Sequence, residues 1–275
     1  MKSFLCGLIG AGIQASRTPA MHEREADAQG VRYLYQKIDL DELGLGVEAL
    51  PELLTAAERM GFAGLNITYP CKQAILPLLH ELSDEARALG AVNTVVLKGG
   101  KRIGHNTDCT GYAEAFRRGL PDVKRDRIVL LGAGGAGAAV AHAVLGLGVR
   151  ELTIFDIDAT RAAELAAKLG AKPGNDLARA MAAADGLIHC TPTGMAELPG
   201  LPLPAELVRP SHWVSEIVYF PLETELLRVA RAKGCRTLDG GGMAVFQAVG
   251  AFRLFTGIEP DAERMLRHFA SMGSL

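Results

Sequence analysis

The sequence predicts an α/β protein of two α/β domains, the second a Rossmann-type doubly wound parallel sheet. Three observations support this. The chain has 275 residues, which exceeds the needs of one small core and suits two domains. Short apolar runs alternate with segments of helical spacing, the pattern of strand–helix units. A glycine-rich loop lies between an apolar run at 128–131 and an Ala-rich segment at 136–147, which is typical of a dinucleotide-binding turn.

The first half reads as an α/β layer. The expected strands are 4–9, 32–38 and 63–67, which are apolar or alternating runs. The expected helices begin at Pro19, span 47–60 and 71–81, and include a short one capped by Ser83. Residues 91–97 and 102–105 flank Lys98-Gly99-Gly100-Lys101, which predicts a β-hairpin.

In the second half, a helix over 108–120 leads to Pro121-Asp122, the predicted hinge, and a new unit begins at Arg127. The expected strands are 128–131, 151–155, 186–190, 213–218 and 236–238. The expected helices are 136–147, 160–169, 242–255 and 261–272. This alternation predicts the doubly wound sheet.

Composition and charge argue against several classes of protein. Hydrophobic residues make up 49% and charged residues 22%, so we expect a buried core and not a disordered chain. The net charge of -2 does not favour nucleic acid as a partner. The five cysteines form no C-x-x-C pair, which argues against a disulfide framework and structural zinc. No stretch approaches the roughly 20 apolar residues of a membrane span. We therefore expect no membrane partner and a reduced, cytoplasmic protein.

The sharpest local signal is the G-x-G-x-x-G pattern of Gly132, Gly134 and Gly137. The first glycine permits the tight turn, the second allows the backbone to approach a pyrophosphate, and the third allows close helix–strand packing. The helix N-terminus then offers free N–H groups to the phosphates. The alternative, a glycine-rich turn without a ligand, is disfavoured by the strand–loop–helix context. The predicted cofactor-binding residues here are Gly132, Ala133, Gly134, Gly135, Ala136 and Gly137.

Asp156 lies 24 residues beyond Gly132, near the spacing of about 20 for a ribose-binding acid. A carboxylate there accepts hydrogen bonds from the ribose and repels a 2′-phosphate, so we expect NAD and not NADP. The alternative is that Asp156 only caps the next helix. Arg161 could stack on adenine or pair with a phosphate. Thr191, in the loop after a later strand, is placed to touch the ribose or nicotinamide, although an ordinary turn fits equally well.

Polar residues in the first half cluster at predicted strand ends. An alcohol-oxidising hydride-transfer site needs a group that takes the hydroxyl proton. Lys72 is the candidate for that group, and Asp108 is the candidate to orient it. The remaining candidates, which can bind a polyol and a carboxylate, are Ser16, Thr18, Asn66, Thr68 and Asn93. For Ser16, Thr18 and Asp108 the alternative is helix capping. The histidines lack ligand-type spacing, so no metal is expected.

Several motifs carry a family resemblance. They are Cys6–Gly10, Ser16–His22, Gly64–Gln73, Gly90–Thr94, Gly104–Asp108, Gly132–Gly137, Thr191–Met195, Val218–Thr224, Gly240–Met243 and Gln247. Through them the chain resembles the shikimate/quinate dehydrogenase family over nearly its whole length.

The resemblance implies Lys72 as catalytic acid/base with Asp108 as its partner. It implies that Ser16 and Thr18 hold the substrate carboxylate. The positions implied to contact the ring hydroxyls or line their pocket are Asn66, Thr68, Asn93 and Gln247. The further positions implied for the cofactor are Val218, Gly240 and Met243. It also implies two domains facing across a cleft, with residues 1–107 and 241–275 binding a small-molecule substrate and residues 108–240 binding NAD.

Departures from the family pattern refine these expectations. Ser16-Arg17-Thr18 replaces the Ser-x-Ser of many biosynthetic members, and this form resembles the NAD-using quinate/shikimate branch. Many NADP-using members carry Asn-Arg-Thr where this chain has residues 156–158. Cys71 and Glu216 also depart, which puts substrate preference in doubt.

The predicted reaction is NAD-dependent oxidation of the C3 hydroxyl of shikimate, with quinate as a second candidate, to the 3-dehydro ketone. The alternatives are a dehydrogenase of an aminoshikimate-like ring and a non-catalytic NAD-binding sensor. The strand at 32–38 is a candidate edge for pairing two subunits in a homodimer.

Overall fold

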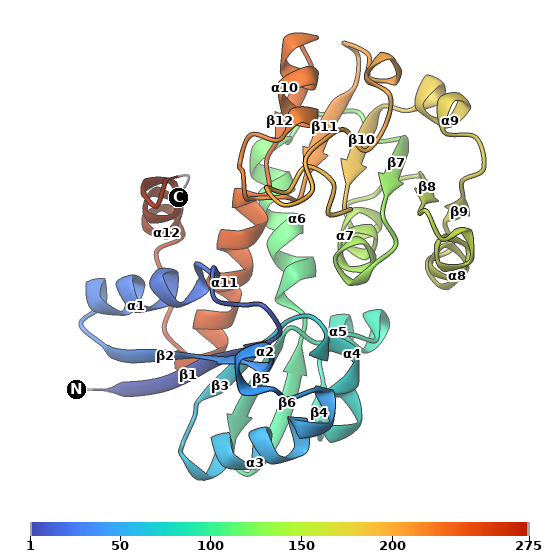
Figure 1. Ribbon diagram of the computed structural model, residues 1–275. Coiled ribbons are helices and arrows are strands. Elements are labelled where there is room, and N and C mark those ends of the chain that lie inside the picture. Colours follow the sequence, from blue (N-terminus) through green and yellow to red (C-terminus); the bar gives the residue numbers. More distant parts are fainter. Residues whose placement is uncertain (1, 274–275) are drawn as a thin grey trace. The chain divides into compact units, whose positions relative to one another are not determined.

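A computed structural model describes residues 2–273, which divide into two compact units (Figure 1). Unit 1 holds the described residues up to Thr107 together with Val245–Ser271, and unit 2 holds Asp108–Ala244. The hinge predicted at Pro121-Asp122 is wrong, because these residues lie inside unit 2. They follow the buried Leu120, and the indole N–H of Trp213 donates to the carbonyl of nearby Lys124 at 2.8 Å.

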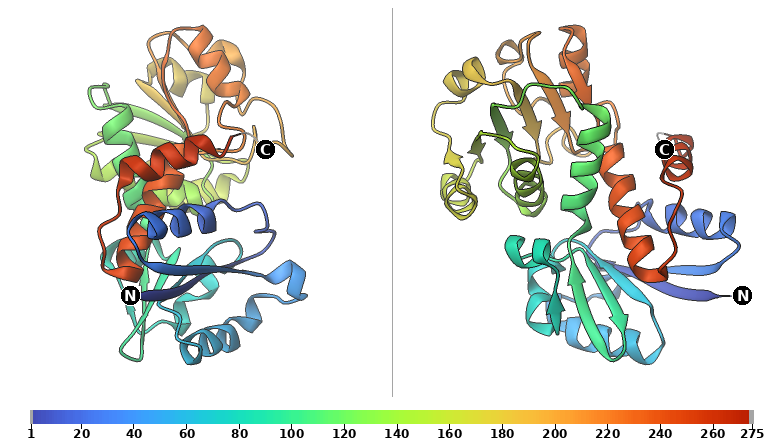
Figure 2. Two further views of the ribbon diagram at one scale, coloured as in Figure 1. Left: turned by 90° about the vertical axis from the view of Figure 1, so that its left-hand side faces the viewer. Right: turned by 180° about the vertical axis from the view of Figure 1, so that it is seen from behind.

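Unit 1 is built on a six-stranded mixed sheet of order β2-β1-β3-β5-β6-β4. The strands are β1 (Ser3–Gly10), β2 (Arg32–Asp39), β3 (Gly64–Ile67), β4 (Glu81–Leu82), β5 (Thr94–Lys98) and β6 (Lys101–His105). β1 pairs in parallel with β2 and β3, while β5 is antiparallel to β3 and β6. The predicted hairpin is confirmed, with Gly99 and Gly100 at φ 61° and 73° in its turn (Figure 2, right). β2 is an edge strand, and its pairing with a second copy stays a prediction.

The helical elements of unit 1 differ more from the sequence prediction than its strands do. They are α1 (Thr18–Ala28), α2 (Leu40–Leu43), η1 (Val47–Ala49), α3 (Leu50–Arg59), α4 (Cys71–Ala74), η2 (Leu76–Leu78), α5 (Asp84–Leu89) and α12 (Ala262–Ser271), with most of α11 (Gly241–Thr256). The single helix predicted over 71–81 is wrong. Pro77 lacks the N–H that a continuing helix needs, and the N–H groups of His80 and Ser83 donate to the carbonyls of Arg102 and Gly104, which draws this stretch into the sheet.

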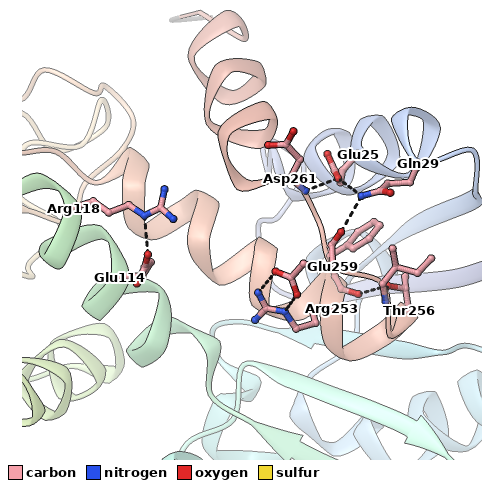
Figure 3. Close-up of polar contacts among 10 residues, drawn as sticks. Glu25, Gln29, Glu114, Arg118, Arg253, Thr256, Glu259 and Asp261 are labelled. Atoms are coloured by element: carbon pink, nitrogen blue, oxygen red, sulfur yellow. Dashed lines mark hydrogen bonds and ion pairs between the residues drawn. The ribbon is translucent and has the colours of Figure 1, made fainter.

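The C-terminal segment of unit 1 is fastened to α1. Glu25 is buried, and its carboxylate accepts hydrogen bonds from the Asp261 N–H at 2.9 Å and from two guanidinium nitrogens of Arg264 at 2.7 Å. Gln29 donates to the Glu259 carbonyl at 3.0 Å (Figure 3). Helix α12 therefore lies against α1, although the two are far apart in the sequence.

Unit 2 contains a six-stranded, fully parallel sheet of order β12-β11-β10-β7-β8-β9. The strands are β7 (Arg127–Leu131), β8 (Glu151–Phe155), β9 (Lys172–Pro173), β10 (Gly186–His189), β11 (Trp213–Glu216) and β12 (Arg236–Leu238). Counted within the unit this is the order 3-2-1-4-5-6 of doubly wound dinucleotide-binding sheets, whose direction of winding reverses between β7 and β10. The predicted Rossmann-type sheet is confirmed.

Helix α6 (Thr107–Gly119), which belongs to unit 2 from Asp108 on, precedes the first of these strands. The elements that connect the strands are α7 (Gly135–Gly146), α8 (Ala159–Leu169), α9 (Leu177–Ala183), the 3-10 turn η3 (Ala205–Leu207) and α10 (Glu225–Ala232). The side chains of Asp158, Asp176 and Thr224 cap α8, α9 and α10. The sequence analysis missed β9, α9 and α10.

Within residues 2–273, no helix has the length and apolar character that a bilayer crossing demands.

Candidate active site

The glycine-rich loop between β7 and α7 has two glycines that packing requires. Gly132 has φ 102°, and a Cβ there would lie 2.6 Å from the carbonyl oxygen of Cys190. A Cβ on Gly137 would collide with the carbonyl oxygen of Gly132. A Cβ on Gly134, by contrast, would project into open space, and no side chain caps the helix that begins at Gly135. The loop thus presents a helix N-terminus beside free space, which suits a phosphate group. Ala133 and Ala136 lie in the same turn.

Asp156 follows β8 and holds this loop in place. One of its carboxylate oxygens accepts from the Ala133 N–H at 2.6 Å, and the other accepts from the Asp158 N–H at 2.9 Å. The alternative that Asp156 caps α8 is wrong, because Asp158 is the capping residue and accepts from the N–H groups of Thr160 and Arg161. The exposed Arg161 guanidinium lies 3.9 Å from the Asp156 carboxylate and 3.7 Å from that of Asp158. This corner carries two negative charges and one positive charge.

A buried polar cluster lies at the carboxyl ends of β10 and β11. His189 and Glu216 are partners in the strand register, and neither is exposed by more than 1%. The Glu216 carboxylate lies 2.9 Å from His189 Nδ1 and accepts from the Val218 N–H and the Thr224 hydroxyl, both at 3.0 Å. His189 Nε2 contacts the Thr191 hydroxyl at 2.5 Å. Burial, and secondarily the Glu216 charge, raise the pKa of the Cys190 thiol well above its ordinary value.

The sequence pattern does not indicate that His189 belongs to this cluster, because its contact with Glu216 depends on the parallel register of two strands. Among the described residues, no group of three or more His, Cys, Asp or Glu side chains is arranged to hold a metal ion.

Of the remaining cofactor candidates, Gly240 packs on the chain that follows this cluster. A Cβ on Gly240 would collide with the carbonyl oxygen of Ile217 and come within 2.6 Å of that of Val218, so the chain after β12 packs tightly on the chain after β11. Met243 is half-buried in the first turn of α11.

In unit 1, the loop that carries Ser16 and Thr18 is shaped by Asp39, which the sequence analysis missed. The Asp39 carboxylate accepts from the N–H groups of Gly12 and Ile13 at 3.0 Å and from the Gln14 amide at 2.9 Å. Desolvation tends to raise the pKa of Asp39, but these bonds outweigh it and hold that pKa below its usual value.

Capping does not account for the three residues for which it was the alternative. The residue before α1 is Arg17, and no side chain caps that helix; the Ser16 hydroxyl instead accepts from the Thr18 N–H at 3.3 Å. Asp108 lies inside the first turn of α6 and not before it. Only 9% of its surface is exposed.

Asn66 and Asn93 belong to one buried hydrogen-bond network. The Asn66 amide donates to the Asn93 carbonyl and the Thr94 hydroxyl, and its oxygen accepts from Tyr35 at 2.6 Å. The Asn93 oxygen accepts from the Thr107 N–H at 2.7 Å, and its amide donates to the Thr107 hydroxyl at 2.9 Å. Both donors of Asn66 are therefore used, whereas Asn93 keeps one N–H for a further acceptor.

The remaining candidates lie on several different segments, and a backbone bond places one of them beside this network. The Val92 N–H donates to the carbonyl of Lys72 at 2.9 Å, which places α4 beside the strand end that carries Asn93. Thr68 follows β3, and a Cβ on Gly10 would collide with its methyl group. Gln247 is half-buried in the part of α11 that belongs to unit 1. Asp108 follows Thr107 directly in the chain.

The two units define an α/β protein whose second unit is a Rossmann-type dinucleotide-binding fold. Comparison with known proteins narrows the class. Residues 8–95 match the model of the shikimate dehydrogenase substrate binding domain, residues 240–268 that of the shikimate 5′-dehydrogenase C-terminal domain, and residues 109–192 that of the ThiF family. The chain belongs to the shikimate/quinate dehydrogenase family.

Relatives match over nearly the whole chain. A shikimate dehydrogenase (NADP(+)) of Streptomyces avermitilis is 58% identical, with 98% of this chain and 96% of the relative covered. A quinate/shikimate dehydrogenase (NAD(+)) of Corynebacterium efficiens is 50% identical, with 98% and 99% covered. The solved structure of quinate dehydrogenase from Corynebacterium glutamicum in complex with NAD superimposes with a TM-score of 0.94 at 48% identity, with 98% of this chain and 100% of that chain covered.

Proposed function

We propose that this protein oxidises the C3 hydroxyl of shikimate, with quinate as a second substrate, to the 3-dehydro ketone with NAD. Residues 1–107 and 241–275 bind the acid, and residues 108–240 bind the cofactor. Membership of the family supports the reaction class, and the names of the relatives support a ring acid as substrate.

The choice of NAD depends on one observation, the position of Asp156. The relatives do not agree, since the one at 58% identity is named for NADP and the one at 50% for NAD. In this chain a carboxylate follows β8 and is bonded to the glycine loop, with Asp158 two residues further. The pair outweighs the single charge of Arg161. Such a corner accepts hydrogen bonds from ribose hydroxyls and repels a 2′-phosphate. Thr191, Val218, Gly240 and Met243 complete the proposed cofactor contacts.

Lys72 is the proposed acid/base. In its neutral form its amine takes the C3 hydroxyl proton while the hydride leaves the same carbon, and Asp108 orients the amine. When bound, NAD supplies the hydride acceptor. Ser16 and Thr18 bind the substrate carboxylate, and the free N–H of Asn93 donates to a ring oxygen. Asn66 acts mainly by holding Asn93, because its own donors are committed. Thr68 and Gln247 line the ring pocket.

The test is the initial rate with shikimate and with quinate, each with NAD and with NADP, beside a Lys72→Ala variant. We expect turnover with NAD and a loss of about 10²- to 10⁴-fold in the variant. If neither acid reacts although NAD binds, the proposal is wrong, and an aminoshikimate-like ring or a sensor role becomes the better hypothesis. A preference for NADP would contradict the role given to Asp156.

A further inference from the structure

The buried His189–Glu216 pair in unit 2 has no role in the reaction described so far. Neither side chain is accessible, and both lie directly behind Thr191 and Val218, two proposed cofactor contacts. Thr191 also lies beside the glycine loop, since a Cβ on Gly132 would come within 3.0 Å of its methyl group. The pair is thus connected to the loop that faces the cofactor.

The hydrogen-bond donors around Glu216 determine where the protons of the cluster lie. The Val218 N–H can only donate. The Thr224 hydroxyl accepts from the Leu227 N–H at 3.3 Å, so its proton is directed at Glu216. Two donors therefore point at a carboxylate that can only accept while ionised. The third neighbour, His189 Nδ1, lies 2.9 Å from both oxygens and must carry a proton.

With His189 taken as a neutral imidazole, this assignment fixes the polarity of Thr191. A neutral ring protonated on Nδ1 has a bare Nε2, and Nε2 then accepts the Thr191 hydroxyl proton. The Thr191 oxygen also accepts from the Thr193 N–H at 3.3 Å. Its proton and one lone pair are used, and one lone pair remains.

We propose that Glu216 and His189 are positioning residues that hold Thr191 as a hydrogen-bond acceptor for a donor group of the dinucleotide, either a ribose hydroxyl or the carboxamide N–H. The inference rests on the proposed function, because it takes the dinucleotide as the ligand. Since Glu216 also holds Val218, one carboxylate sets both loops that follow β10 and β11.

The critical variant is Glu216→Gln, which keeps the shape of the side chain but reverses the contacts of one of its two oxygens. Its carbonyl oxygen still accepts from Val218. Its amide nitrogen, in place of the other oxygen, donates to His189 Nδ1 and to the Thr224 hydroxyl oxygen, whose proton turns away. The imidazole proton then moves to Nε2 and donates to Thr191, whose own hydroxyl turns outward as a donor. Thr191→Val removes the hydroxyl at nearly constant volume. Both variants eliminate the same acceptor.

Dissociation constants for NAD test this directly. We expect each single variant to weaken NAD binding by about three- to tenfold, the value of one hydrogen bond. The double variant should be no weaker than the worse single variant, because both act through one contact. Thr224→Val is the matched control: it removes another bond to Glu216 and the cap of α10, so it should lower the melting temperature but leave NAD affinity within about twofold.

A second measurement is independent of the cofactor. Nitrogen-15 NMR of histidine-labelled protein distinguishes the two imidazole tautomers, and His189→Asn assigns the signal among the seven histidines. We expect the Nδ1–H form in the wild type and the Nε2–H form in Glu216→Gln. An Nε2–H wild type, additive losses in the double variant, or unchanged NAD binding in Glu216→Gln would each overturn the inference while the proposed function stands. If the wild type binds no NAD, both are overturned.

Discussion

In unit 1 the candidate side chains are held mainly by other side chains. In unit 2 the candidate residues are held by the backbone of the glycine loop and by the buried carboxylate of Glu216. The Asn66–Asn93–Thr107 network joins three chain segments through amides and hydroxyls. In unit 2, Gly132 and Gly137 act by lacking a Cβ. Substitutions in the two units should therefore have different structural effects. In unit 1 the loss of one side chain removes hydrogen bonds from several neighbours, whereas in unit 2 an added methyl group affects only the atoms that it meets.

The largest effect is expected from Arg264→Leu, which leaves the buried Glu25 carboxylate without its guanidinium. Breaking a buried pair costs about 3–5 kcal/mol, and the lower end applies because Arg264 is 35% exposed. Hydrogen exchange should show faster exchange in unit 1 and unchanged protection in the sheet of unit 2. Arg253→Leu, which breaks an exposed pair with Glu259 (Figure 3), is the control and should cost less than about 1 kcal/mol. Equal losses of unfolding free energy in the two variants would contradict the larger contribution expected of the buried pair.

The next effect concerns Asn93→Ala, which removes the centre of the unit 1 network. The buried Thr107 N–H loses the Asn93 oxygen as its acceptor, so we expect the free energy of unfolding to fall by about 1–3 kcal/mol. The dissociation constant for the acid should rise while that for NAD stays unchanged. Calorimetric titration measures both, and weaker NAD binding would show that the two units are not independent in this respect.

The glycine loop gives a smaller but cleaner test. Gly134→Ala adds a methyl group where the protein alone has room, so the melting temperature should not fall. The same methyl group occupies the space proposed for a phosphate, and overpacking of about 1–3 kcal/mol corresponds to a loss of roughly 5- to 150-fold in NAD affinity. Gly146→Ala, also in open space but at the far end of α7, is the control and should leave affinity unchanged. Retained affinity in Gly134→Ala would place the phosphate elsewhere.

The smallest effect concerns pH. The folded-state pKa of Asp39 lies below its ordinary value of 3.8. Its contribution to stability is therefore fully present above about pH 4 and is lost as pH falls through the lowered pKa. Asp39→Asn should be less stable than the wild type at neutral pH, with the difference shrinking in acid. Urea unfolding from pH 7 to pH 3 measures it, and a difference that grows in acid would contradict the role given to Asp39.

The sequence predicted best those features whose cause is local. The G-x-G-x-x-G pattern is local, and Asp156 follows it at nearly the spacing that this motif has to its ribose-binding acid, so the pattern alone indicated the loop and its acid. The cluster of His189 and Glu216 was missed because the two are 27 residues apart and meet only through strand register. Asp39 was missed for the same reason, since its partners lie 25 to 27 residues earlier. The helix predicted over 71–81 failed because apolar spacing outweighed Pro77 in that prediction.

The discontinuity of unit 1 has a consequence during synthesis on the ribosome. Residues 108–244 emerge as one uninterrupted stretch and can complete their sheet as soon as they are free. The first 107 residues contain the strands of their own sheet but cannot cover it, because Ala251 and Phe255 of α11 pack on part of that sheet and Arg264 of α12 pairs with Glu25. At ordinary translation rates, Arg264 follows Thr107 by roughly ten to thirty seconds. For that interval, in which unit 2 is itself synthesised, the nascent chain exposes the apolar face around Cys6 and Leu8, and exposed apolar surface of this kind is what chaperones bind.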